Sequence, residues 1–308
     1  MNRLKVLLFG VLLSLAAPLA ALGQDQSKPQ LDDITISPSR VELVMAPGTE
    51  RTVTVKLIYT SVSGQAPPAR IRAYIGDWDM TREGEVTFHK AGTLPNSASP
   101  WMIHTPGEMT VEPGNVHVIR VTVSVPKDAT PGDHLAVLFV EPRPEDLKLL
   151  GNTKQVQVKF RMGAIFYVMV PELARKPALE NLKAEMGQKG ILVTPRLTNQ
   201  GNSHVRPLHS IQVTDRAGAV VAELSDVESI PVLAGKELEA PVLIEQSLPE
   251  GSYSVRYRVR FGEREALTEG VTDLIVRKEV AEKKEPETKT ASPARPAQPT
   301  KQSGGLKQ

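Results

Sequence analysis

The six histidines are the side chains in this sequence best suited to metal binding, and their spacing does not form a known metal motif. There is no HExxH or comparable zinc spacing, although His204 and His209 lie near enough in sequence to be considered together. The chain contains no cysteine, which excludes disulfides, thiolate metal sites and thiol nucleophiles. We therefore expect no metal and no cofactor, and interpret His204 and His209 as polar loop residues.

Two carboxylate pairs, Asp77/Asp79 and Glu83/Glu85, are the remaining candidates for acid–base chemistry. They stand beside turn-like sequence, where acidic residues near glycine usually form turns or remain solvated. The sequence also lacks a GxSxG elbow, a Walker loop and a dinucleotide fingerprint. We therefore predict that the protein has no catalytic residues, is not an enzyme and acts by binding other polypeptides.

The elements that would position binding residues are short strands. Apolar residues alternate over short stretches between Asp32 and Val276, and pairs such as Pro47-Gly48 and Pro131-Gly132 interrupt them. This pattern indicates an all-β protein with two immunoglobulin-like β-sandwich domains in tandem. In the first domain we expect strands near 34–45, 51–59, 70–78, 84–89, 108–112, 116–125, 133–141 and 154–170.

Composition divides the 308 residues into four segments. Residues 1–23 resemble a signal peptide that is cleaved, because Arg3 and Lys5 precede a short apolar run. No other segment is apolar for long enough to span a bilayer, so we expect no transmembrane segment in the mature chain. The first sandwich is predicted over 32–171, the second over 179–277, and a disordered tail rich in Lys, Pro and Ala over 278–308.

The second domain contains the clearest strand and a stripe of positive charge. Tyr253, Val255, Tyr257, Val259 and Phe261 alternate with polar residues, so they face one side of a strand. Three arginines occupy the opposite face and form a possible basic docking face, with a solvated sheet face as the alternative: Arg256, Arg258 and Arg260. Glycine and asparagine predict hairpins at 187–190, 199–202 and 215–218.

Several segments of the first domain occur in the order found in the PapD-like periplasmic pilus-assembly chaperones. They are SPSRV with Arg40, VEPGNVHVIRVTV with Arg120, GDHLAVLFVEPRP and VQVKFRMGAIFYVMVP. Over roughly residues 34–171 the chain therefore resembles the N-terminal immunoglobulin-like domain of that family, as a divergent member. The resemblance implies that the last strand of this domain is donated to an incomplete pilin-like subunit.

The resemblance also implies how a client would be anchored. In the family, an arginine of the first strand and a lysine of the last strand hold the terminal carboxylate of the subunit. Arg40 matches the arginine, whereas the lysine would fall near Ala164, so Arg161 or Lys159 would have to replace it. Arg40 could also simply pair with a neighbouring carboxylate such as Glu42. Four alternating apolar residues would form the donated edge strand: Val156, Val158, Phe160 and Met162.

These observations predict a periplasmic chaperone that assists the assembly of exported pilin-like or adhesin-like subunits, with an outer-membrane assembly protein as a further candidate partner. The alternative is a non-enzymatic scaffold or adhesion-associated protein of the cell envelope, in which case the chain could be secreted or bound to the cell surface. The net charge of +2 does not favour nucleic acid as a partner.

Overall fold

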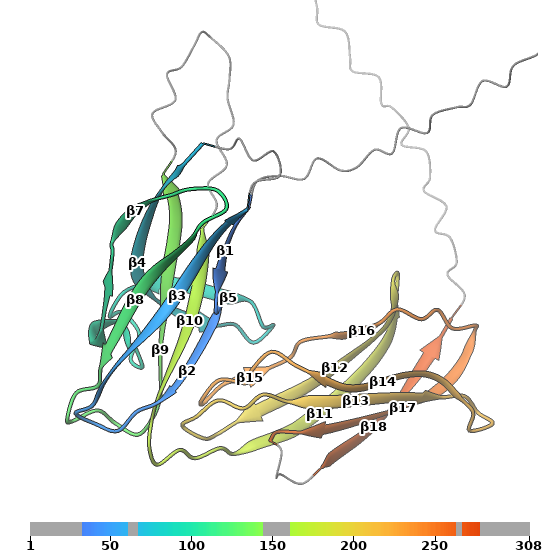
Figure 1. Ribbon diagram of the computed structural model, residues 1–308. Helices are drawn as coiled ribbons and strands as arrows, with labels where there is room; N and C mark the ends of the chain where they lie inside the picture. The colour runs from blue at the N-terminus through green and yellow to red at the C-terminus, as the bar shows by residue number, and fades with distance from the viewer. Residues whose placement is uncertain (1–32, 61–66, 144–160, 263–266, 278–308) are drawn as a thin grey trace, which may run out of the picture.

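The computed structural model describes residues 33–60, 67–143, 161–262 and 267–277. Within these ranges the chain forms eighteen strands and one short 3₁₀ turn, η1 (Ser99–Trp101). The strands build four sheets, which pair into two sandwiches whose strands run in clearly different directions (Figure 1). This architecture confirms the predicted all-β fold. None of the described helices is long and apolar enough to cross a membrane.

Some predicted features lie outside the described residues. They are the signal peptide at 1–23, the tail at 278–308, and four residues of the proposed donated strand and anchor: Val156, Val158, Lys159 and Phe160.

The first sandwich consists of a four-stranded and a six-stranded sheet. The smaller sheet contains, in spatial order, β1 (Asp33–Ser37), β3 (Glu50–Thr60), β8 (Val116–Ser124) and β6 (Met102–Thr105). The larger sheet contains, in spatial order, β2 (Arg40–Val44), β10 (Met162–Val170), β9 (Gly132–Arg143), β4 (Ala69–Met80) and β5 (Val86–Lys90), with β7 (Glu108–Val111) also paired to β4.

The strand predicted over 34–45 is divided in two. Proline has no N–H to donate to a sheet ladder, and Pro38 separates β1 from β2. β1 pairs with β3 in one sheet, whereas β2 pairs with β10 in the other. This change of sheet places Arg40, the first residue of β2, directly beside β10.

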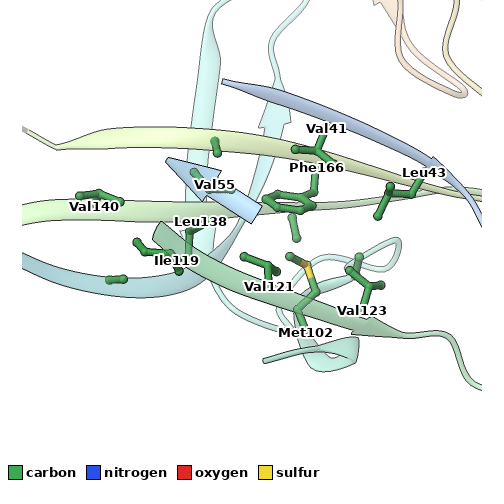
Figure 2. Packing of buried hydrophobic residues seen from close by; sticks show 14 of the residues in the cluster. Val41, Leu43, Val55, Met102, Ile119, Val121, Val123, Leu138, Val140 and Phe166 are labelled. Carbon is green, nitrogen blue, oxygen red and sulfur yellow. The ribbon is translucent and has the colours of Figure 1, made fainter. Parts of the chain in front are cut away.

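Alternating aliphatic residues from both sheets fill the first core (Figure 2). Val55 and Leu57 of β3 and Val121 and Val123 of β8 are fully buried, as their alternation predicts. Phe166 of β10 is also fully buried, and Figure 2 shows it close to Val55 and Val121. β10 is therefore held firmly by the core, and it is the strand from which the candidate site is built.

The second sandwich consists of two four-stranded sheets. One contains β11 (Pro177–Gly187), β12 (Gly190–Asn199), β15 (Glu237–Leu238) and β16 (Val242–Ile244). The other contains, in spatial order, β14 (Val220–Glu228), β13 (Leu208–Thr214), β17 (Gly251–Arg260) and β18 (Thr268–Val276). The predicted turns at 187–190 and 215–218 connect β11 to β12 and β13 to β14.

The hairpin predicted at 199–202 is wrong. This segment leads from β12 in one sheet to β13 in the other. Its asparagine side chains bind the segment that joins the two sandwiches: Asn199 Oδ1 accepts from Lys176 N–H, and Asn202 Oδ1 accepts from Ala174 N–H. Asparagine stands here because it can donate and accept at once, not because a tight turn requires it.

The two sandwiches share an apolar contact on the outer face of the larger sheet. Trp78, Tyr167 and Met169 are buried there against Leu233 of the second sandwich and Leu173 of the connecting segment. Ion pairs cross the same junction, including Lys236 Nζ to Asp79 Oδ2 at 2.7 Å. The relative placement of the two sandwiches is therefore set by packed side chains as well as by the connecting segment.

Gly132 offers a test of this junction. Its φ is +123°, and a Cβ at this position would stand 2.6 Å from the carbonyl oxygen of Asn202 in the second sandwich. We expect Gly132→Ala to lower the free energy of unfolding by about 2–3 kcal/mol, because both the backbone conformation and the contact become unfavourable. Gly114 is the matched control, since its φ is +80° and an added Cβ meets nothing within 4 Å.

Urea unfolding followed by tryptophan fluorescence measures this effect, because both tryptophans of the chain, Trp78 and Trp101, lie in the first sandwich. Gly114→Ala should cost only about 1 kcal/mol, the penalty of the backbone conformation. An equal loss in the two variants would contradict the proposed role of the Asn202 contact.

Candidate functional site

The candidate site begins at a free edge of β10. On one side β10 pairs with β9 along its whole length, from Met162 opposite Val140 to Val170 opposite Gly132. On its other side the pairing with β2 runs only from Ile165 opposite Arg40 onward. Among the described residues, Met162, Gly163 and Ala164 therefore have no strand partner on that side. Unpaired backbone groups of this kind can accept a strand from another chain.

The side chains of β10 alternate between two environments. Met162, Ala164 and Phe166 point into the core of the first sandwich. Gly163, Ile165 and Tyr167 face a cleft of about 660 Å³, which the second sandwich also lines. A strand added to the free edge would follow the same alternation, with every second side chain directed toward this cleft.

Arg40 lies where the free edge ends. Its Nε is 3.5 Å from Glu42 Oε1, so the predicted alternative partner is present. Its Nη1 also donates to Glu228 Oε1 of the second sandwich, at 3.1 Å. The Arg40 side chain remains 48% exposed, so both ion pairs are accessible to solvent and easily exchanged.

Arg206 of the second sandwich is a second cation at the cleft, and the sequence did not indicate it. Its Nε and Nη2 atoms each lie 3.1 Å from Glu42 Oε1, and its Cζ is 5.3 Å from the centroid of the Tyr167 ring. Arg40 and Arg206 therefore approach the same carboxylate of Glu42 from different domains. Arg206 follows Arg40 by 166 residues, and no local motif marks it.

Tyr167 separates the two arginines from the buried junction. Burial raises the pKa of Tyr167 to about 12, although Arg206 acts in the opposite direction. The phenol is therefore neutral at physiological pH, so it does not add a negative charge that would compete with Glu42 for the arginines. The Trp78 and Tyr167 rings pack in a T-shaped arrangement, with ring centroids 5.3 Å apart.

Arg161 lies elsewhere on the sheet. It precedes Ile165, the partner of Arg40, by four residues, or about 13 Å along an extended strand. Its guanidinium group stacks on the Phe139 ring, with Cζ 4.2 Å from the centroid, and Nη1 donates to the Tyr74 hydroxyl at 3.4 Å. The structure thus places Arg206, and not Arg161, beside Arg40.

The position expected for the lysine of the family is apolar in this chain. Ala164 is fully buried in the first core, and Ile165 is the residue that faces the cleft. β10 therefore contributes no cation at positions 164 and 165. The second positive charge at the cleft comes from the other sandwich.

The three arginines of β17 share one face, as the strand period predicts, but carboxylates accompany two of them, Arg256 and Arg260. Arg256 Nε is 3.4 Å from Glu269 Oε1, and Arg260 Nη2 is 3.0 Å from Asp226 Oδ1. An acidic partner would have to displace these carboxylates.

The interpretation of His204 and His209 as polar loop residues is wrong, because both are buried and His209 lies on β13. His204 is hydrogen-bonded to Asp133, with Nδ1 and Oδ2 2.7 Å apart. His209 lies 3.5 Å from the Tyr257 hydroxyl, and burial lowers the pKa of His209. In the described part of the chain, no group of three or more His, Cys, Asp or Glu residues is arranged to hold a metal ion.

Comparison with known proteins identifies structural neighbours of this fold. A chain of a solved structure described as a chaperone–tip adhesin complex of CFA/I fimbriae biogenesis matches with a TM-score of 0.43 and 14% identity, covering 78% of this chain and 98% of its own. The class 5 fimbriae chaperone CfaA matches with a TM-score of 0.40 and 14% identity, covering 80% of this chain and 100% of its own. The CupB2 chaperone of Pseudomonas aeruginosa has a TM-score of 0.37 and 17% identity, covering 78% and 100%.

No protein-family model matches the sequence. No curated protein matches it either. The three solved structures share 14–17% sequence identity with this chain.

Proposed function

We propose that this chain is a periplasmic chaperone-like protein that binds exported pilin-like or adhesin-like subunits through the free edge of β10 and assists their assembly. The observation that carries this proposal is the register of the larger sheet. Among the described residues, the edge of β10 opposite β9 has no strand partner ahead of Ile165, and β2 begins at that point with Arg40. A client strand at the free edge would therefore lie in line with β2 and end beside a guanidinium group.

The direction of the client strand follows from this arrangement. β2 runs parallel to β10. A client strand that also runs parallel to β10 reaches Arg40 with its carboxyl end, and a guanidinium group binds a carboxylate through two parallel hydrogen bonds. An antiparallel strand would instead place its amino-terminal end beside the same arginine. That end is either a positively charged amino terminus or a point at which the client chain runs on, and neither provides a carboxylate. The charge of Arg40 favours a parallel client strand with a free carboxylate.

Residues 156–162 provide the apolar side of the proposed interaction. Val156, Val158, Phe160 and Met162 share the alternation of Ala164 and Phe166, which point into the core. We propose that Val156, Val158 and Phe160 complete the core of the client, whereas Met162, the fourth residue of the predicted donated strand, already packs against the core of the first sandwich. Each of the first three side chains could contribute about 1.5–3 kcal/mol before the cost of ordering the chain is subtracted.

The present partners of Arg40 do not prevent such binding. Glu228 Oε1 accepts a hydrogen bond from Arg40, yet its side chain is 55% exposed. An exposed ion pair of this kind contributes at most about 1 kcal/mol, so a client carboxylate can replace it. Glu228 thus acts as a substitute anion in the free protein.

An affinity pull-down from periplasmic extract tests the proposal, with retained proteins identified by mass spectrometry. We expect the wild type to retain pilin-like or adhesin-like subunits. Arg40→Ala and the Val158→Asp/Phe160→Asp double variant should each retain at least tenfold less, because they remove the carboxylate anchor and the apolar contact respectively. Circular dichroism would establish that the variants fold.

Glu228→Gln provides a control with the opposite sign. It removes the competing carboxylate from Arg40, so client retention should rise about twofold to fivefold. If the wild type, Arg40→Ala and the double variant retain the same proteins, strand binding with a carboxylate anchor is wrong and a scaffold of the cell envelope becomes the better account.

A further inference from the structure

The cleft beside Arg40 is charged at one end and apolar through most of its interior. Arg40 and Arg206 provide the charged end. Six residues from both sandwiches provide the apolar lining: Trp78, Met80, Val86, Ile165, Ile230 and Pro231. An anion alone would use only the arginines, so the apolar part indicates a ligand with both a negative charge and a large apolar group.

The apolar lining is accessible from outside the protein. Val86 of β5 is 39% exposed, and Ile230, between β14 and β15, is 40% exposed. These aliphatic side chains come from two domains and line the same cleft. An apolar group that enters the cleft buries them from water, which is favourable.

The cleft is also continuous with the free edge of β10. Gly163 and Ile165 line the cleft, and Gly163 belongs to the unpaired part of the strand. Gly163 presents no side chain to the cleft, and an added Cβ would stand 2.9 Å from Val137 Cγ2. The end of a strand paired with this edge can therefore direct a side chain into the cleft beside Gly163 without meeting a side chain at that position.

We propose that the cleft selects the last residue of the client, which must carry a large aliphatic or aromatic side chain together with its free carboxylate. This inference rests on the proposed function and specifies the class of client. Arg40 and Arg206 bind the carboxylate from two different domains, and the terminal side chain packs between Ile165 and Ile230. A client that ends in a small or acidic residue leaves the apolar lining exposed or places a second negative charge within it.

Fluorescence anisotropy with labelled peptides tests this selection on the purified protein. The probes are ten-residue peptides of alternating threonine and valine that end in leucine, serine or aspartate with a free carboxylate, and a fourth that ends in leucine amide. We expect the leucine acid to bind about tenfold more tightly than the serine acid, because it buries one more large side chain. The aspartate acid and the leucine amide should also bind at least tenfold more weakly than the leucine acid.

A variant pair assigns the selection to the cleft. Ile230→Ser should reduce the preference for leucine over serine to about threefold or less. Val220→Ser should leave it unchanged, because Val220 is a 50% exposed valine of the same sandwich that does not line the cleft.

The outcomes separate this inference from the proposed function. If the leucine and serine acids bind equally and both bind more tightly than the amide, terminal selection is wrong while the carboxylate anchor stands. If the acid and amide bind equally, or if none of the peptides binds, the anchor fails and the inference fails with it. If Ile230→Ser keeps the full preference for the leucine acid over the serine acid, the cleft does not select the terminal side chain.

Discussion

Asp77→Asn should lower the free energy of unfolding of the first sandwich by about 3–5 kcal/mol, although the two side chains have the same shape. The Asp77 carboxylate is fully buried in β4. It accepts five hydrogen bonds of 2.5 to 3.2 Å, from the backbone N–H groups of Gly92, Thr93 and Leu94 and from the hydroxyls of Ser97 and Ser99. An amide group turns its own N–H donors toward some of these donors and leaves them unpaired in the interior.

Urea unfolding followed by tryptophan fluorescence measures this loss, and Asp79→Asn is the control. Asp79 stands two residues away on the same strand, where its partly exposed carboxylate accepts from Lys236 at 2.7 Å. Its replacement should cost at most about 1 kcal/mol. A loss of under 1 kcal/mol in Asp77→Asn would show that the hydrogen bonds to the carboxylate are not needed to fix residues 92–99.

The same carboxylate predicts a dependence on pH. Burial alone would raise the pKa of Asp77, but hydrogen bonds from Ser97, Ser99, Leu94 and Gly92 hold that pKa below its ordinary value. The stabilisation by the ionised group is therefore complete above about pH 4, where the unfolded chain is also ionised, and is lost as pH falls through the folded-state pKa. The difference in stability between wild type and Asp77→Asn should consequently shrink in acid.

The sequence predicted the sandwiches well because burial in a strand repeats every two residues. Alternation alone places Val55 and Leu57 on the core face of their strand, for example, and both are fully buried. The environment of Asp77, in contrast, does not follow from alternation. The local sequence indicates a turn or surface carboxylate at Asp77, because its hydrogen-bond donors lie 15 to 22 residues further along the chain. Only the folded sheet brings these donors close to the Asp77 carboxylate.

The candidate site was predicted in part for a similar reason. Arg40 follows from a local motif at the start of a strand, and the structure places it at the end of the free edge of β10. Arg206 could not be found in this way, because its role depends on how the second sandwich packs against the first. Glu42 is the residue that joins them, since both arginines contact its Oε1 atom.

A buried hydrogen-bonded pair next to this site fixes the second sandwich on the first. Asp133 Oδ2 of β9 accepts from the His204 backbone N–H at 2.5 Å and is 2.7 Å from His204 Nδ1. The imidazole also packs on the Tyr167 ring, with centroids 4.2 Å apart. Both Asp133 and His204 are almost completely buried, so water cannot replace a lost partner without opening the junction.

Asp133→Ala should therefore lower the free energy of unfolding by about 3–5 kcal/mol, since it leaves two buried groups of His204 without their acceptor. Asp128→Ala, at an exposed aspartate in the preceding turn, should change it by less than about 0.5 kcal/mol. A double-mutant cycle with His204→Ala should give a coupling energy of about 1–3 kcal/mol, because the two side chains contact each other directly. Additive losses would mean that Asp133 acts only through the backbone N–H of His204. Tyr167 packs on His204, and Arg206 follows His204 by two residues. We therefore expect Asp133→Ala also to move Arg206 away from Arg40 and to weaken carboxylate binding at the cleft.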